Sequence, residues 1–204
     1  MSDLRYEIGI DEAGRGPLAG PVAVGVVLVP VDFDWRKLAN VNDSKKLTEK
    51  KRDELYRQAV VLRKQGQLDF AVVQTSAKKI DAIGIVSAVK LAMERALRKV
   101  QREVGDWSDV VVKLDGGLVA PEYCVYQETI IKGDAKEKVI GLASVVAKVT
   151  RDRYMCQQAK KPVFSLYQFA QHKGYGTKVH RSLIEAHGLS TMHRESYCKN
   201  VKVL

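Results

Sequence analysis

Residues 5–29 read RYEIGIDEAGRGPLAGPVAVGVVLV, two apolar runs joined by a short segment of glycine, alanine and proline. Runs rich in β-branched residues and bounded by glycine or proline are typical of strands, so we expect strands at 5–10 and 22–29. The segment between them has no room for a crossover helix. The two strands are therefore expected to pair antiparallel.

Further along the chain, three more β-branched runs predict strands at 68–73, 110–115 and 125–131. Helical patterns lie between and after them. Because these later strands alternate with helices, we expect them to pair in parallel. The predicted fold class is α/β, a mixed five-stranded sheet with helices on both faces. No internal repeat or linker composition divides the chain, so we expect a single domain over 1–204.

Four helices are expected from apolar residues at helical spacing and from end signals. Thr48 is a candidate cap for the first helix, Asp81 is expected to open the second, and the third follows Asp134. A fourth covers 177–187 and stops at Gly188, a residue favoured just past a helix end. The predicted inward face of the second helix consists of Val86, Val89, Met93, Leu97, Val100 and Val104.

The chain of 204 residues carries a net charge of +10, and the excess is concentrated in its last third. Residues 132–204 hold 14 Lys and Arg against five Asp and Glu, and all four histidines. This basic third is either a solvated face or a binding surface for a polyanion, most often nucleic acid. A membrane-surface role fits less well, because no basic amphipathic helix with Trp or Phe on its apolar face occurs there.

The three cysteines, Cys124, Cys156 and Cys198, have no close spacing and cannot all pair, as is typical of a reducing compartment. No stretch approaches the length of an apolar membrane span, and the first residues lack the basic and apolar regions of a signal peptide. We therefore expect a cytoplasmic protein with no membrane partner.

Four carboxylates follow the ends of predicted strands. Asp11 and Glu12 end the first, Asp115 ends the fourth, and Asp134 follows the fifth. Ligand sites in open α/β sheets lie outside strand ends, so we expect these acids at one edge. Converging carboxylates raise one another's pKa unless cations compensate, and Mg²⁺ takes such oxygen ligands. Two such ions can activate a water and stabilise the leaving oxygen of a phosphodiester.

An alternative interpretation gives each acid a local structural role. Asp134 is a good helix cap, and Asp115 before two glycines is a good turn residue. Adjacent strand residues also face opposite sides of a sheet, so Asp11 and Glu12 can share a site only if the backbone there leaves regular strand geometry.

The segment Gly14-Arg15-Gly16 suggests a close backbone approach to a ligand, with a guanidinium able to grip phosphate or sugar oxygens. It is not a dinucleotide fingerprint, because its glycine spacing differs and a strand rather than a helix follows. No phosphate-binding P-loop sequence occurs either, so no nucleotide cofactor is expected. An ordinary turn would explain the glycines but not the adjacent acids.

Taken together, these segments resemble the bacterial ribonuclease HII family over roughly residues 5–200. The resemblance rests on six segments in order: GIDEAGRGP (9–17), NDSKKL (42–47), the strand end at Asp115, KGD (132–134), ASVVAKVTRDR (143–153) and HKGYGT (172–177). The related ribonuclease HIII branch carries a lysine between the motif glycines, where this chain has Arg15.

The resemblance implies a ribonuclease H fold and hydrolysis of the phosphodiester 5′ to a ribonucleotide, leaving a 3′-hydroxyl and a 5′-phosphate. Its expected partners are RNA/DNA hybrids and duplex DNA with single embedded ribonucleotides, and its expected role is the removal of ribonucleotides from DNA. We expect a monomer. The implied cofactors are Mg²⁺ or Mn²⁺ in a two-metal mechanism. The implied catalytic and metal-binding residues are Asp11, Glu12, Asp115 and Asp134.

The resemblance also assigns substrate contacts. Gly14, Arg15 and Gly16 would read the 2′-hydroxyl and adjoining phosphate, the group that separates RNA from DNA. Tyr175, which lies in the basic third, would face the sugar of the following deoxynucleotide. Ser44 and Lys45 would hold phosphates, and such contacts position a duplex without reading its sequence.

Other interpretations stay open at this point. The chain could be another two-metal nuclease of the same fold, or a non-catalytic nucleic-acid-binding protein. Tyr175 could be a turn aromatic and Ser44 a helix-entry residue. The cations of 148–153 are more often a solvated face, and Asp152 could simply pair with Lys148. A zinc site from His172, His180, His187 and His193 matches no common spacing, so surface or junction histidines are favoured.

Overall fold

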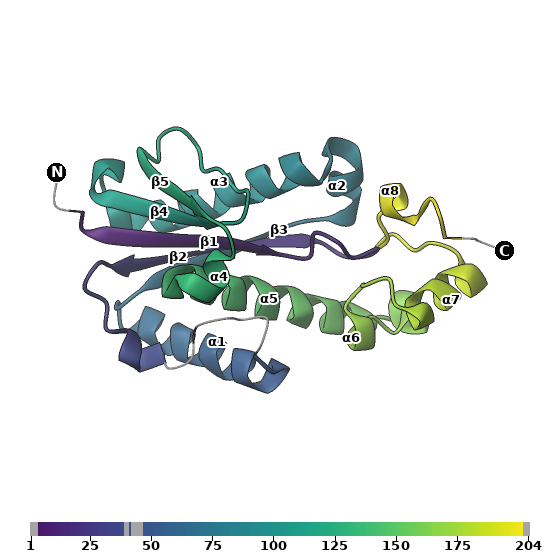
Figure 1. Cartoon of the computed structure of the whole chain (residues 1–204). Coiled ribbons are helices and arrows are strands. Elements are labelled where there is room, and N and C mark those ends of the chain that lie inside the picture. The colour runs from purple at the N-terminus through teal and green to yellow at the C-terminus, as the bar shows by residue number, and fades with distance from the viewer. Residues whose placement is uncertain (1–3, 39–40, 42–46, 202–204) are drawn as a thin grey trace.

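The computed structural model describes residues 4–38, 41 and 47–201, and their strands form a five-stranded sheet in the order β3-β2-β1-β4-β5 (Figure 1). β1 pairs antiparallel with β2, and β2 with β3, whereas β1–β4 and β4–β5 are parallel. The predicted mixed sheet is confirmed. The strands are β1 Tyr6–Ala13, β2 Val22–Pro30, β3 Asp69–Thr75, β4 Val110–Asp115 and β5 Tyr126–Ile130.

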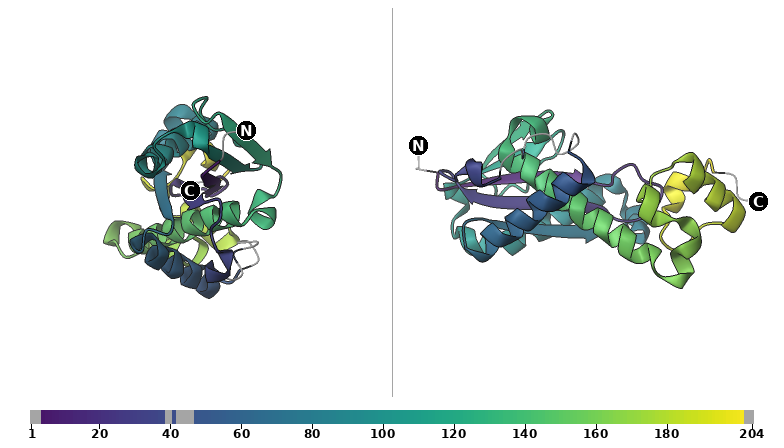
Figure 2. Two further views of the ribbon diagram at one scale, coloured as in Figure 1. Left: turned by 90° about the vertical axis from the view of Figure 1, so that its left-hand side faces the viewer. Right: turned by 90° about the horizontal axis from the view of Figure 1, so that it is seen from below.

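Helices cover both faces of the sheet, with α3 on one side and α5 backed by α1 on the other (Figures 1 and 2). The helices are α1 Glu49–Lys64, α2 Ala77–Ile83, α3 Ile85–Val104, α4 Gly133–Lys136, α5 Lys138–Ala159, α6 Phe169–His172, α7 Lys178–His187 and α8 Glu195–Cys198. Short 3₁₀ turns cover Trp35–Leu38, Trp107–Asp109 and Pro162–Tyr167. The described part of the chain has no helix that could cross a membrane.

The second predicted helix is two helices. Ser76 caps α2 by accepting a hydrogen bond from the Lys79 N–H, and Gly84, with φ at +78°, breaks the chain before α3 begins. Asp81, expected to open the helix, instead lies within α2. Val86, expected inward, is 56% exposed because this break sets the rotation of α3. The remaining predicted inward positions are buried: Val89, Met93, Leu97, Val100 and Val104.

Helix α5 lies directly on the backbone of β1 and β2. A Cβ at Gly9 would lie 2.3 Å from the Val139 carbonyl oxygen, and one at Gly25 would lie 2.4 Å from that of Ala143. Fourteen of the 22 residues of α5 are buried, so it is a core helix rather than an amphipathic one. The two glycines therefore set how closely α5 can approach the sheet.

The later helices form a cap beyond the end of the sheet, reached by the C-terminal end of α5 (Figure 2). Its core includes Phe164, Tyr167 and Phe169, which pack with Met155 of α5 and Ala19 from the segment after β1. The described chain begins at the opposite end of the molecule, beside β1, and finishes next to α8 in the cap (Figure 1).

Substituting Gly25 with alanine should lower the free energy of unfolding by at least about 2 kcal/mol, because the added Cβ has backbone rather than a mobile side chain in its way. Urea denaturation measures the loss. Gly117→Ala is the control, since its Cβ would meet nothing within 4 Å. Equal effects of the two substitutions would contradict the packing argument.

Candidate active site

Asp11 lies at the end of β1, on the face covered by α5. Side chains alternate along a strand, and Gly9, two residues earlier, faces α5. The Asp11 side chain is buried and hydrogen-bonds Ser144 of α5. Burial, with the nearby carboxylates of Glu12 and Asp115 adding to it, raises the pKa of Asp11 to about 8. A positive charge next to Asp11 would therefore favour its ionised form.

Asp115 lies beside Asp11, and the backbone of Asp134 lies against Asp115. The parallel register pairs Ile10 of β1 with Leu114 of β4. Asp11 and Asp115 are the next residues on these adjacent strands, so they lie at the same sheet edge. Asp115 Oδ1 accepts hydrogen bonds from the N–H groups of Gly133, at 2.7 Å, and of Asp134, at 3.4 Å. Asp134 is 3% exposed and lies within α4, between β5 and α5. Three segments thus bring Asp11, Asp115 and the backbone of Asp134 to one edge of the sheet.

Glu12 leaves the strand on the other face. β1 keeps regular pairing with β2 through Ala13, so the backbone does not leave strand geometry at the acid pair. The Glu12 carboxylate makes an ion pair with Arg15, with Nη1 to Oε1 at 3.0 Å. The four acids lie at one edge of the sheet, but Glu12 faces the side opposite to Asp11. Among the described residues, no three His, Cys, Asp or Glu side chains are arranged as a ready metal site.

Residues 14–21 are here called the glycine loop. The two glycines on either side of Arg15 differ in their surroundings. Gly14 has φ at +93°, and a Cβ there would lie 2.1 Å from Nε of Arg151. A Cβ at Gly16 would meet nothing within 4 Å. Gly14 is thus explained by the fold. Packing leaves Gly16 unexplained, and its bare backbone leaves room for a ligand to approach.

Tyr175 lies next to the glycine loop, on residues 172–177, here called the tyrosine loop. The N–H groups of Leu18 and Ala19 donate to the Gly174 carbonyl, at 2.9 and 3.2 Å. The Tyr175 ring is 41% exposed, and two cations of α5 face it, Lys148 Nζ at 5.3 Å and Arg151 Cζ at 5.7 Å from its centroid. Hydrogen bonds thus join the two loops implicated by the sequence.

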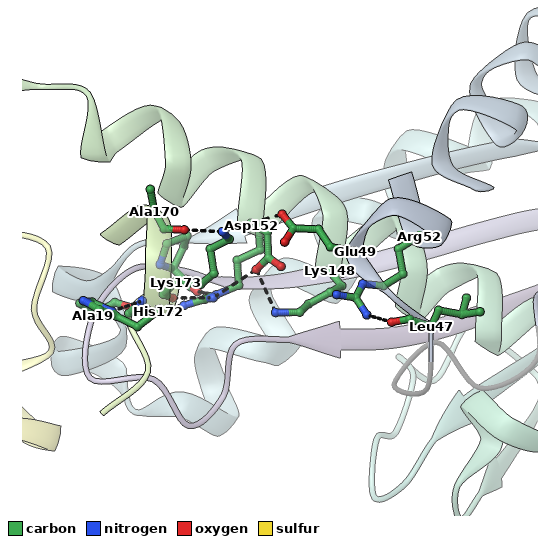
Figure 3. A network of polar contacts seen from close by, with 12 residues as sticks. Ala19, Leu47, Glu49, Arg52, Lys148, Asp152, Ala170, His172 and Lys173 are labelled. Carbon is green, nitrogen blue, oxygen red and sulfur yellow. Dashed lines mark hydrogen bonds and ion pairs between the residues drawn. The ribbon is translucent and has the colours of Figure 1, made fainter. Parts of the chain in front are cut away.

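The cations of 148–153 are not one solvated face. Lys148 pairs with Asp152 at 2.9 Å, as considered from the sequence (Figure 3), and Arg153 is exposed and pairs with Asp53 at 2.7 Å. Arg151 is completely buried, contrary to expectation. Arg194 is also completely buried and was not singled out from the sequence. A lone arginine in a polar stretch gives no sequence signal of burial.

Ser44 and Lys45, the predicted phosphate contacts, lie outside the described residues. Next to this gap, Arg52 of α1 donates a hydrogen bond to the Leu47 carbonyl (Figure 3). Figure 3 also shows Lys173 of the tyrosine loop close to Glu49 at the start of α1, with Nζ to Oε1 at 3.8 Å. Polar contacts thus run from the tyrosine loop to α1.

Of the two roles expected for the histidines, surface or junction, burial excludes the surface role for three of the four. His172, His180 and His193 are at most 8% exposed, and the rings of His172 and His180 stack at 4.1 Å. His187 is exposed. These side chains also form no metal site among the described residues.

Hydrogen bonds assign the tautomers of this histidine cluster. His180 Nδ1 donates to the Tyr175 carbonyl at 2.9 Å, which leaves its Nε2 to accept from His193 Nε2 at 3.0 Å. His193 Nδ1 in turn accepts from the Ser190 N–H at 2.9 Å. Burial above all lowers the pKa of His180 and His193 to about 4. The neutral cluster therefore fixes the backbone on which Tyr175 sits.

Similarity to known proteins identifies the family of the chain. Residues 8–200 match the profile of the family described as ribonuclease HII. The chain belongs to the ribonuclease HII family. It is similar to ribonuclease HII of Fusobacterium nucleatum, with 42% identity over an alignment of 204 residues that covers 98% of this chain and 90% of that protein. Membership makes the chain a ribonuclease H endonuclease that acts on nucleic acid.

Solved structures support the ribonuclease H-like fold. The chain resembles ribonuclease HII in its complex with PCNA from Archaeoglobus fulgidus, with a TM-score of 0.71, 23% identity, and 95% and 94% of the two chains covered. It also resembles Bst-RNase HIII in complex with Mn²⁺, with a TM-score of 0.68, 15% identity, and 95% and 67% covered. The sequence-based assignment to ribonuclease HII is confirmed.

Gly16→Ala should leave the free energy of unfolding within about 0.5 kcal/mol of wild type, because its Cβ enters open space. It should weaken cleavage, because the Cβ occupies the space left for substrate. Gly14→Ala should instead destabilise the fold, since its Cβ meets Arg151. Urea denaturation and nuclease assays separate the two. A Gly16→Ala enzyme with wild-type activity would show that the space is unused.

Acid should destabilise the protein through the histidine cluster. The folded pKa values of His180 and His193 lie below the unfolded value of 6.5, so these histidines do not lower the free energy of unfolding above about pH 6.5. As pH falls towards 4, the unfolded chain binds protons that the folded chain does not, and the free energy of unfolding decreases by about 2 kcal/mol for each histidine. Urea denaturation from pH 7.5 to 4.5 measures the loss. His193→Gln should flatten the profile; the exposed His187→Gln should not.

Proposed function

We propose that this chain is a Mg²⁺- or Mn²⁺-dependent endonuclease that cuts 5′ to a ribonucleotide, leaving a 3′-hydroxyl and a 5′-phosphate. Its substrates would be RNA/DNA hybrids and single ribonucleotides in duplex DNA, and its role the removal of ribonucleotides from DNA. One observation carries the proposal: the carboxyl groups of Asp11 and Asp115 lie close together, the Asp134 backbone lies against Asp115, and β1 leads from Asp11 into a loop with open space at Gly16.

The chemistry of the acids fits divalent cations. All the donors are carboxylate oxygens, which Mg²⁺ and Mn²⁺ prefer, and burial makes the negative form of Asp11 costly without a neighbouring positive charge. Asp11, Asp115 and Asp134 would hold the ions, with Glu12 at the same edge. When bound, two ions would supply the positive charge and the activated water that phosphodiester hydrolysis needs. The Mn²⁺ complex of the HIII relative supports this choice.

The chain's own groups would position the substrate. The backbone at Gly16 would lie against the ribose and its phosphate, and Arg15, paired with Glu12, could reach a phosphate oxygen. The half-exposed ring of Tyr175 would lie against the sugar of the next nucleotide. The Tyr175 backbone is held by the hydrogen bond from His180 Nδ1 to its carbonyl. Ser44 and Lys45 would hold phosphates further along the duplex.

A non-catalytic binding protein is a weaker account of the site. Carboxylates repel phosphate unless cations intervene, and a protein that only binds nucleic acid has no use for three of them beside its binding loop. We further propose that the enzyme acts as a monomer in the cytoplasm. The single-domain assignment over 1–204, with the substrate loop in the basic third, remains part of the proposal.

The deciding experiment compares two duplexes in the presence of Mg²⁺ or Mn²⁺, one of DNA alone and one with a single ribonucleotide. We expect a single cut 5′ to the ribonucleotide and none in the DNA duplex, because the loop is proposed to recognise the 2′-hydroxyl. Gel analysis against marked fragments identifies the ends. Equal cutting of both duplexes, or none of either, would refute the proposal.

Asp11→Asn should lower cleavage of the single-ribonucleotide duplex roughly a thousandfold while retaining duplex binding. It should also keep or raise the free energy of unfolding, because it removes a buried carboxylic acid whose charged form is disfavoured. Asp32→Asn, which removes an exposed acid, is the matched control. Cleavage retained by Asp11→Asn would remove this residue from the mechanism.

A further inference from the structure

Two completely buried arginines, Arg151 and Arg194, have no part in the chemistry proposed above. Burying a guanidinium is costly unless its donors are satisfied. Among the described residues neither makes a close ion pair: the distance from Arg151 to Asp152 is 3.9 Å, and Arg194 donates to three main-chain carbonyls and hydrogen-bonds the Tyr197 side chain. Their burial therefore needs a reason other than pairing with a carboxylate.

Arg194 holds both ends of the glycine loop. Its Nη2 donates to the Gly14 carbonyl at 2.6 Å, its Nη1 to that of Arg15 at 2.8 Å and its Nε to that of Gly20 at 3.0 Å. Burial, with the nearby Arg151 adding to it, lowers the pKa of Arg194 to about 10, so it stays charged at neutral pH.

Arg151 joins the glycine loop to the tyrosine loop. Its Nε donates to the Pro21 carbonyl at 2.8 Å and its Nη2 to that of Ala19 at 3.1 Å, both on the glycine loop. Its Nη1 donates to the Lys173 carbonyl at 3.0 Å, two residues before Tyr175. One rigid guanidinium thus spans both loops.

These contacts determine which way the exposed peptides face. In a trans peptide, the carbonyl of one residue and the N–H of the next point in opposite directions. Because the carbonyls of Gly14 and Arg15 point inward to Arg194, the N–H groups of Arg15 and Gly16 point away from it. Both residues are exposed, so these donors face the side from which a ligand comes.

We propose that Arg194 and Arg151 are positioning residues for ribonucleotide recognition: Arg194 turns the N–H groups of Arg15 and Gly16 towards the substrate, and Arg151 fixes their distance from Tyr175. This inference rests on the proposed function of the same site. It assigns the effect to the forked geometry of the guanidinium and not to its charge alone.

The test replaces Arg194 with lysine, which keeps the charge, and with glutamine, which does not. Both should lower kcat for the single-ribonucleotide duplex at least about tenfold, because lysine cannot hold three carbonyls in one plane. The dissociation constant for the uncut DNA duplex should change less than about twofold, since that binding depends on phosphate contacts elsewhere. Arg98→Gln, an exposed arginine paired with Glu94 on α3, is the control.

Chemical rescue separates positioning from folding. Adding millimolar guanidinium to Arg194→Ala should restore part of kcat, whereas sodium chloride at equal ionic strength should not. A general loss of stability would instead worsen with guanidinium, which denatures proteins. Thermal unfolding of every variant shows which are folded at the assay temperature.

The outcomes are distinct. If wild type does not select the ribonucleotide, the proposed function fails and this inference fails with it. If wild type selects it and Arg194→Lys cuts at the wild-type rate, only the positioning role is refuted. Loss of DNA binding in parallel with cleavage, or unfolding of both the lysine and glutamine variants at the assay temperature, would also refute it, because the residue would then only maintain the fold.

Discussion

The close packing of α5 on two glycines is the constraint on which the rest of the molecule depends. With no side chain at Gly9 or Gly25, the helix backbone reaches the sheet, and every turn of α5 then falls at a defined height above β1 and β2. Ser144 of α5 thereby contacts Asp11, and Arg151, further along the same helix, lies beneath the glycine loop. A single helix thus fixes the position of Asp11 relative to the glycine loop.

Buried ionisable groups lie on either side of the short segment that joins Asp11 to the glycine loop. Asp11 and Asp134 are buried at the sheet edge, while Arg151 and Arg194 are buried beneath the glycine loop. The raised pKa of Asp11 keeps this carboxyl largely protonated at neutral pH until a cation lies next to it. Arg194 stays charged and donates to main-chain carbonyls, which holds the loop backbone in one conformation. Burying guanidinium groups costs stability, which the apolar core of the sheet offsets.

Much of the fold could be predicted because its signals are local. Runs of β-branched residues identified all five strands, and parallel pairing brought strand-end acids to one edge. Rotation was harder: the position of Gly84 decides which residues of α3 face inward, so Val86 was assigned to the wrong side. The site was predicted as a set of residues, but the opposite facing of Asp11 and Glu12 depends on β1 remaining regular up to Ala13.

Burial of polar residues could not be predicted from the sequence. The partners of Arg151, Arg194 and the histidine cluster are mostly main-chain groups of distant segments, and main-chain groups leave no trace in residue type. Only the folded chain shows that the carbonyls of the glycine loop need donors. For the same reason Gly14 and Gly16 look alike in sequence, although one is required by packing and the other is not.

The position of the two chain ends has a practical side. The last described residue, Val201, packs with Leu18 of the glycine loop, Ile184 and Cys198, whereas the described chain starts at the far end of the molecule by β1. An affinity tag or fluorescent protein joined after the C-terminus would emerge next to the glycine loop, which we propose contacts the substrate. The same fusion at the N-terminus would emerge the length of the sheet away, and is the sounder choice for purification and imaging.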